Sequence, residues 1–103
     1  MIEFTEGYHT YHIYILTNKS KTVLYTGLTN NLKLRLQQHK ESLNPNSFTS
    51  KYSTYFLLYY EKFSWVQEAI AREKEIKGWK RDKKIELIKT LNPDVEFLNY
   101  LFE

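Results

Sequence analysis

Alternating apolar and polar positions near the amino terminus predict two β-strands joined by a turn. Residues 11–17 (YHIYILT) and 22–28 (TVLYTGL) are rich in β-branched and aromatic side chains, and the polar residues 18–21 between them are typical of a turn. Alternation divides the first strand into two faces, with Tyr11, Ile13 and Ile15 on one and His12, Tyr14 and Leu16 on the other. We therefore expect an antiparallel hairpin with different neighbours on each face.

A helical repeat of leucines follows the hairpin. Asn30 or Asn31 is placed to cap a helix that runs to about Ser42. The apolar stripe of this helix consists of three leucines, Leu32, Leu36 and Leu43. Residues 55–63 (YFLLYYEKF) then predict a third strand, and their continuous apolar character favours a strand covered on both faces.

Two further helices are predicted in the carboxyl-terminal half. Ser64 and Gln67 form a capping-box pattern that opens the first of them, and Gly78 ends it. The second helix runs from about Asp82 to Asn92, which precedes a proline. Its inward positions are Ile85, Ile88 and Leu91.

The order of these elements, ββαβαα, predicts an α+β fold. We expect a small three-stranded antiparallel sheet flanked by helices, with the apolar tail over residues 95–102 packed back onto it. A length of 103 residues fits one domain with one core, so we assign residues 1–103 to a single domain.

One charged residue interrupts the apolar stripe of the second predicted helix. That stripe consists of Val66, Ala69, Ile70 and Ile76, and Glu73 falls near its centre. An inward carboxylate is costly unless a cation compensates it, so a metal ion, an arginine or a lysine is expected nearby. The alternative is a rotated helix in which Glu73 lies at the solvated edge and pairs with Lys77.

The first predicted helix shows a similar anomaly. His39 lies on its leucine stripe, and Arg35 lies one turn earlier, beside it. An arginine can bind a phosphate group through two hydrogen bonds, and a neighbouring histidine can position or transfer a proton. The alternative is a histidine packed at the edge of the core and an arginine that covers apolar surface with its stem.

The hairpin adds two tyrosines and a glycine. Tyr14 and Tyr25 are each explained by packing in a sheet, whereas Gly27 within a strand indicates close approach by another backbone or by a ligand. Taken together with Arg35 and His39, these residues form a set that is suited to phosphate chemistry if the fold brings them to one place.

Composition narrows the function classes. Fifteen Lys and Arg against twelve Asp and Glu give a net charge of +3, which weakly favours an anionic partner. The absence of cysteine excludes disulfide frameworks, cysteine nucleophiles and zinc ribbons. No apolar run approaches the ~20 residues of a membrane span, and no signal segment is visible, so we expect a cytoplasmic protein without membrane contacts.

Three segments in this order resemble the GIY-YIG nuclease superfamily. The tripeptides 12–14 (HIY) and 25–27 (YTG) resemble its paired signature, residues 31–39 its helix with Arg and His four apart, and residues 68–79 the helix with its metal-binding Glu. The likeness covers about residues 11–93, leaving 94–103 as a tail, and is greatest to the small stand-alone bacterial branch. The signature departs from the family pattern at His12 and Thr26, which replace Gly and Ile, and both changes fit that branch.

This resemblance implies hydrolysis of a nucleic-acid phosphodiester bond with one divalent cation, Mg²⁺ or Mn²⁺. Glu73 would be the sole protein ligand of the cation. Arg35 would stabilise charge on the phosphoryl group, and Tyr25 or Tyr14, assisted by His39, would orient and deprotonate the attacking water, with Tyr25 favoured. Two residues would support the site structurally, Gly27 and Asn92.

The resemblance also implies DNA as the partner. Five basic residues near the last two helices are candidates for phosphate contacts, namely Lys74, Lys77, Lys80, Arg81 and Lys84. Each is equally well explained as part of a solvated helix surface. Because the net charge is small, we expect a second copy or a protein partner to help hold the substrate. The competing readings are a nucleic-acid-binding module of the same fold with little or no catalysis, and an interaction domain that uses its aromatic surface for a protein partner.

Overall fold

The computed structural model describes residues 10–41 and 51–103, and within them the elements follow the predicted ββαβαα order. The strands are β1 (Tyr11–Thr17), β2 (Leu24–Thr29) and β3 (Phe56–Phe63). The helices are α2 (Leu32–Glu41), α4 (Val66–Lys77) and α5 (Arg81–Leu91), followed by a short 3-10 helix, η1 (Asn99–Phe102). The α+β fold predicted from the sequence is therefore confirmed.

The three strands form one antiparallel sheet in the order β2-β1-β3. In this register Tyr14 of the central strand lies opposite Gly27 of β2 and opposite Tyr60 of β3. A bulge interrupts the pairing of β1 with β3 between Ile15 and Leu16. β2 and β3 are the edge strands, so residues on their outer sides can contact groups beyond the sheet.

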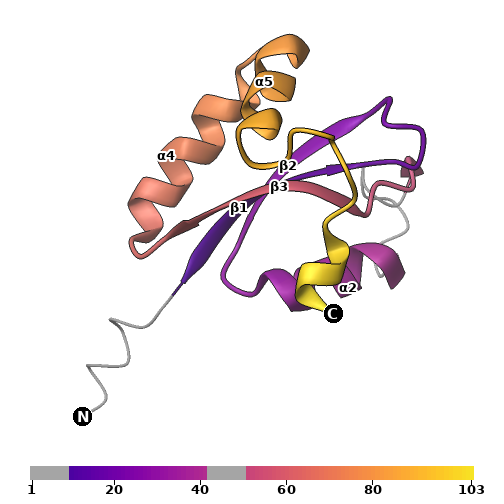
Figure 1. Ribbon diagram of the computed structural model, residues 1–103. Helices are drawn as coiled ribbons and strands as arrows, with labels where there is room; N and C mark the ends of the chain where they lie inside the picture. Colours follow the sequence, from indigo (N-terminus) through magenta and orange to yellow (C-terminus); the bar gives the residue numbers. More distant parts are fainter. Residues whose placement is uncertain (1–9, 42–50) are drawn as a thin grey trace.

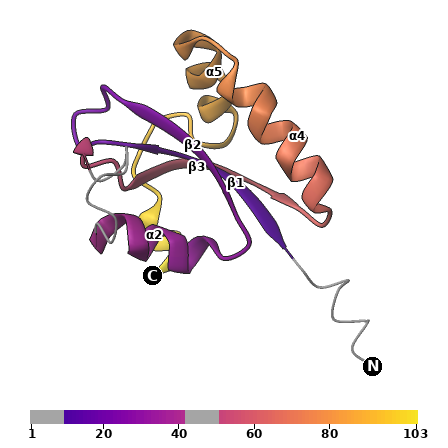
Figure 2. The same cartoon turned by 180° about the vertical axis from the view of Figure 1, so that it is seen from behind.

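Helices cover both faces of the sheet (Figures 1 and 2). On one face Ile13 and Ile15 pack with side chains of α4 and α5. On the other face Tyr14 and Leu16 pack with the leucines of α2 and with Leu98 before η1. The predicted division of β1 into two faces is confirmed, as is the covering of β3 on both sides.

The turn of the hairpin is longer than predicted, and β2 begins at Leu24 rather than at Thr22. The side-chain oxygen of Asn18 accepts hydrogen bonds from the backbone N–H groups of Thr22 (2.8 Å) and Val23 (3.2 Å). Because these two N–H groups bond to Asn18 rather than to the opposite strand, they lie outside the ladder.

The predicted cap of α2 is confirmed, and that of α4 is wrong. The Asn31 side chain accepts the N–H of Leu34 at 3.1 Å. At α4 the N-cap is Trp65, with no side-chain hydrogen bond, so Ser64 and Gln67 do not form the expected capping box. Gly78 ends α4 as predicted.

Of the predicted inward positions, Leu32, Leu36 and Ile88 are buried, and Ile85 is partly buried against the core. Leu91 was expected to face inward, but it is 45% exposed because α5 ends there and its last turn passes the edge of the core. Leu43 and the predicted helix end at Ser42 lie outside the described residues.

The tail packs back onto the sheet as predicted. The N–H of Leu98 donates to the carbonyl of Leu57 at 2.7 Å, and the Asn99 side chain bonds both to the N–H of Leu57 and to the carbonyl of Tyr55. η1 is thereby held beside α2 on one face of the sheet (Figure 1). Among the residues described, none of the helices has the length and apolar character needed to cross a membrane.

Candidate active site

Gly27 lets the ring of Tyr14 lie directly over the edge strand. A β-carbon at Gly27 would overlap Cζ and the hydroxyl oxygen of Tyr14. The sequence predicted close approach by a backbone or a ligand, whereas the approaching group is this phenol ring. Tyr14 is 1% exposed, so its hydroxyl is held in one place across β2.

His39 joins the two tyrosines into one cluster. Its Nε2 lies 3.0 Å from the hydroxyl oxygen of Tyr14, within hydrogen-bond distance. The centroid of its ring lies 5.8 Å from those of both Tyr14 and Tyr25, with edge-to-face geometry in each pair. The fold thus brings together residues from β1, β2 and α2, as the sequence anticipated.

Arg35 and Glu73 act electrostatically on this cluster. Burial raises the pKa of Tyr14 well above its usual range, the charge of Arg35 opposes that shift, and the carboxylate of Glu73 adds to it. Burial, assisted by the charge of Arg35, lowers the pKa of His39 to about 4. Tyr14, Tyr25 and His39 are thus in contact, and Arg35 and Glu73 lie near enough to act on the pKa of Tyr14. Near pH 7 Tyr14 is protonated and His39 is neutral.

Glu73 reaches the site from the flank of α4 rather than from its centre. The fully buried residues of α4 are Ala69 and Ile76, whereas Ile70, expected on the stripe, is 37% exposed. The helix is thus rotated relative to the prediction. Glu73 retains a side-chain exposure of 19% and forms an ion pair with Lys77 at 3.1 Å.

The arrangement combines both readings of Glu73 that the sequence left open. The carboxylate pairs with Lys77 at the helix edge, and it also acts on Tyr14. No cluster of three or more His, Cys, Asp or Glu side chains able to hold a metal ion occurs in residues 10–41 and 51–103. A single carboxylate is nonetheless compatible with Mg²⁺, which keeps several waters and takes few protein ligands, although Lys77 would compete with the ion for Glu73.

Asn92 stabilises the connection between α5 and the tail. It is 4% exposed, and its side-chain amide donates to the carbonyls of Leu58 (3.0 Å) and Glu96 (2.8 Å) while its oxygen accepts the N–H of Glu96 (3.0 Å). These bonds hold the start of the tail against β3. Its structural role is clear, and it makes no direct contact with the tyrosine cluster among the bonds described.

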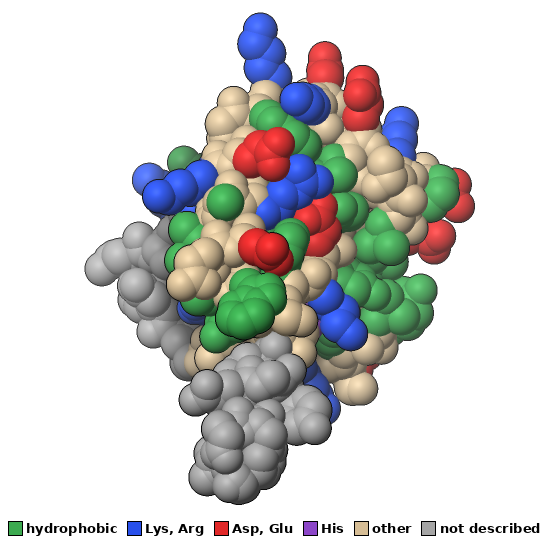
Figure 3. Space-filling view, turned by 90° about the vertical axis from the view of Figure 1, so that its left-hand side faces the viewer, with side chains coloured by type: hydrophobic (Ala, Val, Ile, Leu, Met, Phe, Trp, Pro, Cys, Tyr) green, Lys and Arg blue, Asp and Glu red, His purple; other side chains and the backbone are tan. Residues whose placement is uncertain are grey.

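The candidate DNA-binding residues do not share one role. Lys74 and Lys80 are exposed, Lys77 pairs with Glu73, and Lys84 is partly buried. Arg81 donates to the backbone carbonyls of Lys21 and Thr22, so it fastens α5 to the hairpin turn. On the side of the molecule where α4 lies, Figure 3 shows acidic and basic side chains interspersed rather than a continuous basic patch.

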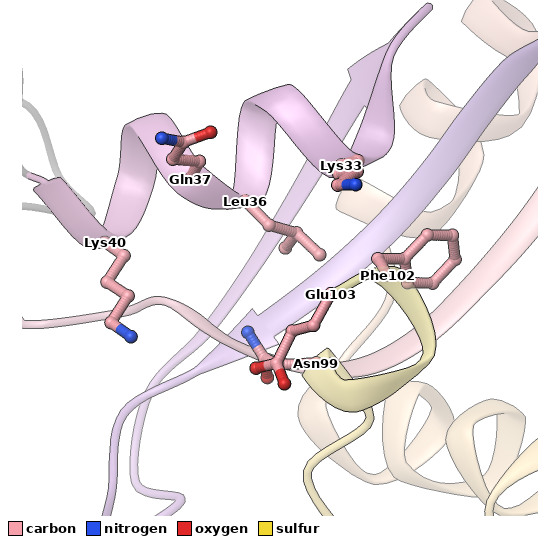
Figure 4. A pocket seen from close by; sticks show the side chains of 7 residues that line it. All are labelled: Lys33, Leu36, Gln37, Lys40, Asn99, Phe102 and Glu103. Atoms are coloured by element: carbon pink, nitrogen blue, oxygen red, sulfur yellow. The ribbon is translucent and has the colours of Figure 1, made fainter.

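A cavity of about 220 Å³ lies between α2 and the tail, apart from the tyrosine cluster (Figure 4). Leu36 and Phe102 contribute its apolar lining, and Lys33, Gln37 and Lys40 project from α2. The spacing of these three residues places them on a different side of α2 from Arg35 and His39. The cavity is therefore separate from the candidate active site.

The sequence missed an ionic network between α4 and β3. Arg72 donates from Nε and Nη2 to the two carboxylate oxygens of Glu61 in β3, and Tyr59 donates its hydroxyl to the same carboxylate at 2.5 Å. The available signal was Glu61 itself, an acidic residue inside the apolar strand sequence 55–63.

Comparison with known proteins identifies the family of this chain. Residues 10–86 match the family described as the GIY-YIG catalytic domain. The UPF0213 protein OB0043 of Oceanobacillus iheyensis is 38% identical over 78 residues, covering 76% of this chain and 88% of that protein. The UPF0213 protein CPE1444 of Clostridium perfringens is 38% identical over 77 residues, covering 75% and 81%.

The fold also resembles that of a solved relative. The solution NMR structure of the UPF0213 protein BH0048 from Bacillus halodurans aligns with a TM-score of 0.55 at 26% identity, over 88% of this chain and 93% of that one. With a family match over most of its length and relatives above 30% identity that align over nearly their whole length, the chain belongs to the GIY-YIG family and, within it, to the small UPF0213 proteins.

Proposed function

We propose that this protein is a metal-dependent endonuclease that hydrolyses phosphodiester bonds in DNA, in repair or processing. The observation that carries the proposal is the hydrogen-bonded pair of Tyr14 and His39, on which Arg35 and Glu73 both act electrostatically. A phenol, an imidazole, a guanidinium and a carboxylate in one place provide the groups that phosphodiester hydrolysis requires.

The two tyrosines take different roles in this proposal. Tyr14 is buried and protonated, so its hydroxyl is suited to orienting His39 rather than to abstracting a proton. Tyr25 is only half-buried, which leaves it accessible to the attacking water. This supports Tyr25 as the group that orients the nucleophile, with neutral His39 as the proton acceptor beside it.

In this proposal the scissile phosphate binds between Arg35 and Glu73. The exposed guanidinium of Arg35 can donate two hydrogen bonds to phosphoryl oxygens and stabilise the charge that develops on them. Glu73 would hold a Mg²⁺ or Mn²⁺ ion, which when bound supplies Lewis-acid stabilisation of a phosphate oxygen. Lys77 would then have to share or release the carboxylate, since its ammonium nitrogen lies 3.1 Å from Glu73 Oε2.

The test is a cleavage assay with flapped, branched, nicked and single-stranded DNA, and matching RNA, in Mg²⁺ or Mn²⁺. We expect cation-dependent cleavage of DNA that Glu73→Gln and Arg35→Ala each reduce by about 10²-fold or more. Glu68→Gln, an exposed acidic position on the same helix, is the matched control and should retain the wild-type rate. Cleavage that survives Glu73→Gln would contradict the proposal, as would the absence of cleavage on every substrate.

The second candidate is a nucleic-acid-binding module without catalysis. The observation that favours it is the Lys77–Glu73 ion pair, since a lysine already neutralises the carboxylate that would hold the metal. In that case the protein binds DNA with unchanged affinity in the presence of a metal chelator and cuts none of the substrates. Sedimentation with and without DNA would show whether a second copy contributes to binding.

A further inference from the structure

We propose that Arg72 is a positioning residue, whose ion pair with Glu61 of β3 sets the rotation of α4 at which Glu73 faces the tyrosine cluster. The role of Glu73 as metal ligand rests on the function proposed above. The rotation itself is a property of the fold and can be tested without metal.

The contact between Arg72 and Glu61 is a fork with defined geometry. Nε lies 2.9 Å from Oε1 and 3.2 Å from Oε2, and Nη2 lies 2.8 Å from Oε2, so two nitrogens of the guanidinium hold the two carboxylate oxygens. The side chains are 24% and 18% exposed, and the hydroxyl of Tyr59 donates to Glu61 Oε2. A two-point, partly buried contact of this kind restricts orientation more than a single exposed ion pair does.

The remaining contacts of Arg72 use the rest of the guanidinium. Nη1 donates to Glu75 at 2.9 Å, and the guanidinium carbon lies 5.3 Å from the centroid of the Trp79 ring. Glu75 belongs to the same helix as Arg72, so that bond cannot orient the helix relative to the sheet. Within the described network, Glu61 is the partner that joins Arg72 to a strand.

Helical geometry connects this contact to Glu73. At about 100° per residue, the buried pair Ala69 and Ile76 defines the inward direction of α4, and Arg72 and Glu73 lie about 50° to either side of it. Arg72 is bound to edge strand β3, while Glu73 acts on Tyr14, whose hydroxyl lies over the opposite edge strand, β2. The two side chains therefore anchor opposite flanks of one helix.

A small rotation of α4 would displace the carboxylate appreciably. Side-chain ends lie roughly 5–6 Å from a helix axis, so a rotation of about 20° moves them by about 2 Å. Apolar packing fixes the rotation of α4 only weakly, because its buried residues are Ala69 and Ile76 while Ile70 is exposed. The directional contact between Arg72 and Glu61 of β3 fixes the rotation that apolar packing does not determine.

The experiment compares Glu61→Gln with Glu75→Gln. Both remove one carboxylate from the same guanidinium, but only the first weakens the link to the sheet, because the glutamine amide keeps one acceptor oxygen and loses the charged fork. Mn²⁺ affinity is measured by water-proton relaxation without DNA, and folding is checked by circular dichroism. We expect Glu61→Gln to remain folded and bind Mn²⁺ at least fivefold more weakly, with Glu75→Gln unchanged. Arg72→Lys, which keeps the charge but loses the fork, should resemble Glu61→Gln.

A second measurement addresses rotation directly. The ring resonances of Tyr14 should shift on Glu73→Gln in the wild-type background, and this shift should be lost or strongly reduced in the Glu61→Gln background. Wild-type Mn²⁺ affinity in folded Glu61→Gln together with an unchanged response of Tyr14 would overturn the positioning role. If the wild type itself takes up no Mn²⁺ and cuts no DNA, the proposed function fails, while the Tyr14 response still decides whether Arg72 orients α4.

Discussion

At Gly27, the position of a β-carbon coincides with the ring of Tyr14. Gly27→Ala therefore forces the most buried tyrosine of the cluster to move. We expect it to lower the free energy of unfolding by about 1–3 kcal/mol and to impair the proposed cleavage, since overpacking displaces the Tyr14 hydroxyl from His39. Urea denaturation and the cleavage assay measure the two effects.

Gly78→Ala is the matched control. The nearest atom to a β-carbon there is the Glu75 carbonyl oxygen at 3.6 Å, and the backbone has an ordinary helical φ of −81°. This variant should be neutral or slightly more stable than the wild type. A tolerated Gly27→Ala would show that the ring of Tyr14 is not held as described.

His39 gives a prediction about pH. Its pKa in the folded protein is lowered to about 4 from 6.5, so the unfolded chain takes up a proton that the folded chain resists. Stability should fall as pH drops from 6.5 towards 4, and His39→Gln should remove part of that slope. An NMR titration checks this directly, and a His39 ring that titrates near 6.5 would contradict the burial that causes the shift.

At the scale of elements, Lys77 of α4 pairs with Glu73 and would compete with the cation proposed to bind there. Lys77→Gln removes the ammonium group, so Mn²⁺ affinity measured without DNA should rise. Exposed ion pairs contribute about 0.2–1 kcal/mol, which corresponds to a gain of about 1.4- to 5-fold. Lys74→Gln, an exposed position on the same helix, is the comparison, and equal gains in both variants would indicate a general charge effect rather than release of Glu73.

The junction between α5 and the tail depends on Asn92. Asn92→Ala leaves the buried carbonyl of Leu58 without its donor and removes two further bonds to Glu96. We expect a loss of about 2–4 kcal/mol in the free energy of unfolding, measured by urea denaturation. Asn30→Ala, at an exposed position, should lower the free energy of unfolding far less. A similar loss in both variants would show that Asn92 does not hold the tail in place.

The elements differ in how far the sequence could predict them. The hairpin and α2 follow from local patterns, and period-two alternation assigned Ile13 and Tyr14 to the correct faces. The sequence left two rotations of α4 open and could not choose between them, because the choice depends on the contact between Arg72 and Glu61, which are eleven residues apart and meet only in the folded chain. The exposure of Leu91 likewise depends on where the core ends, which periodicity does not report.

At the scale of the whole molecule, His39 and Glu73 became candidates because their types are uncommon on apolar stripes, and the resemblance to a known family completed the set. Arg35, His39 and Glu73 were identified from sequence, and the structure brings them to the tyrosines. The basic residues were harder to interpret, because a lysine has the same pattern whether it is solvated or bound. Arg81 illustrates this, since its guanidinium bonds to the hairpin backbone.

Two separate pairs of exposed lysines make it possible to test which side of the molecule binds DNA. Lys74 and Lys80 lie near the end of α4, and Lys33 and Lys40 lie beside the cavity on α2. If DNA crosses α4, the double variant Lys74→Gln, Lys80→Gln should reduce the slope of log affinity against log salt by about 2. The Lys33→Gln, Lys40→Gln pair should leave that slope unchanged, and the reverse result would place DNA on the α2 side.

The overlap of Gly27 with the ring of Tyr14 means that the two positions share one volume. A side chain can enter position 27 without displacing the ring of Tyr14 only if the residue at position 14 becomes smaller. Combining Gly27→Ala with Tyr14→Ala should therefore relieve the clash that Gly27→Ala causes alone while leaving the phenol absent. Glycine at position 27 and tyrosine at position 14 therefore depend on each other. The edge strand accommodates a larger residue at position 27 without a clash only when the Tyr14 hydroxyl is absent.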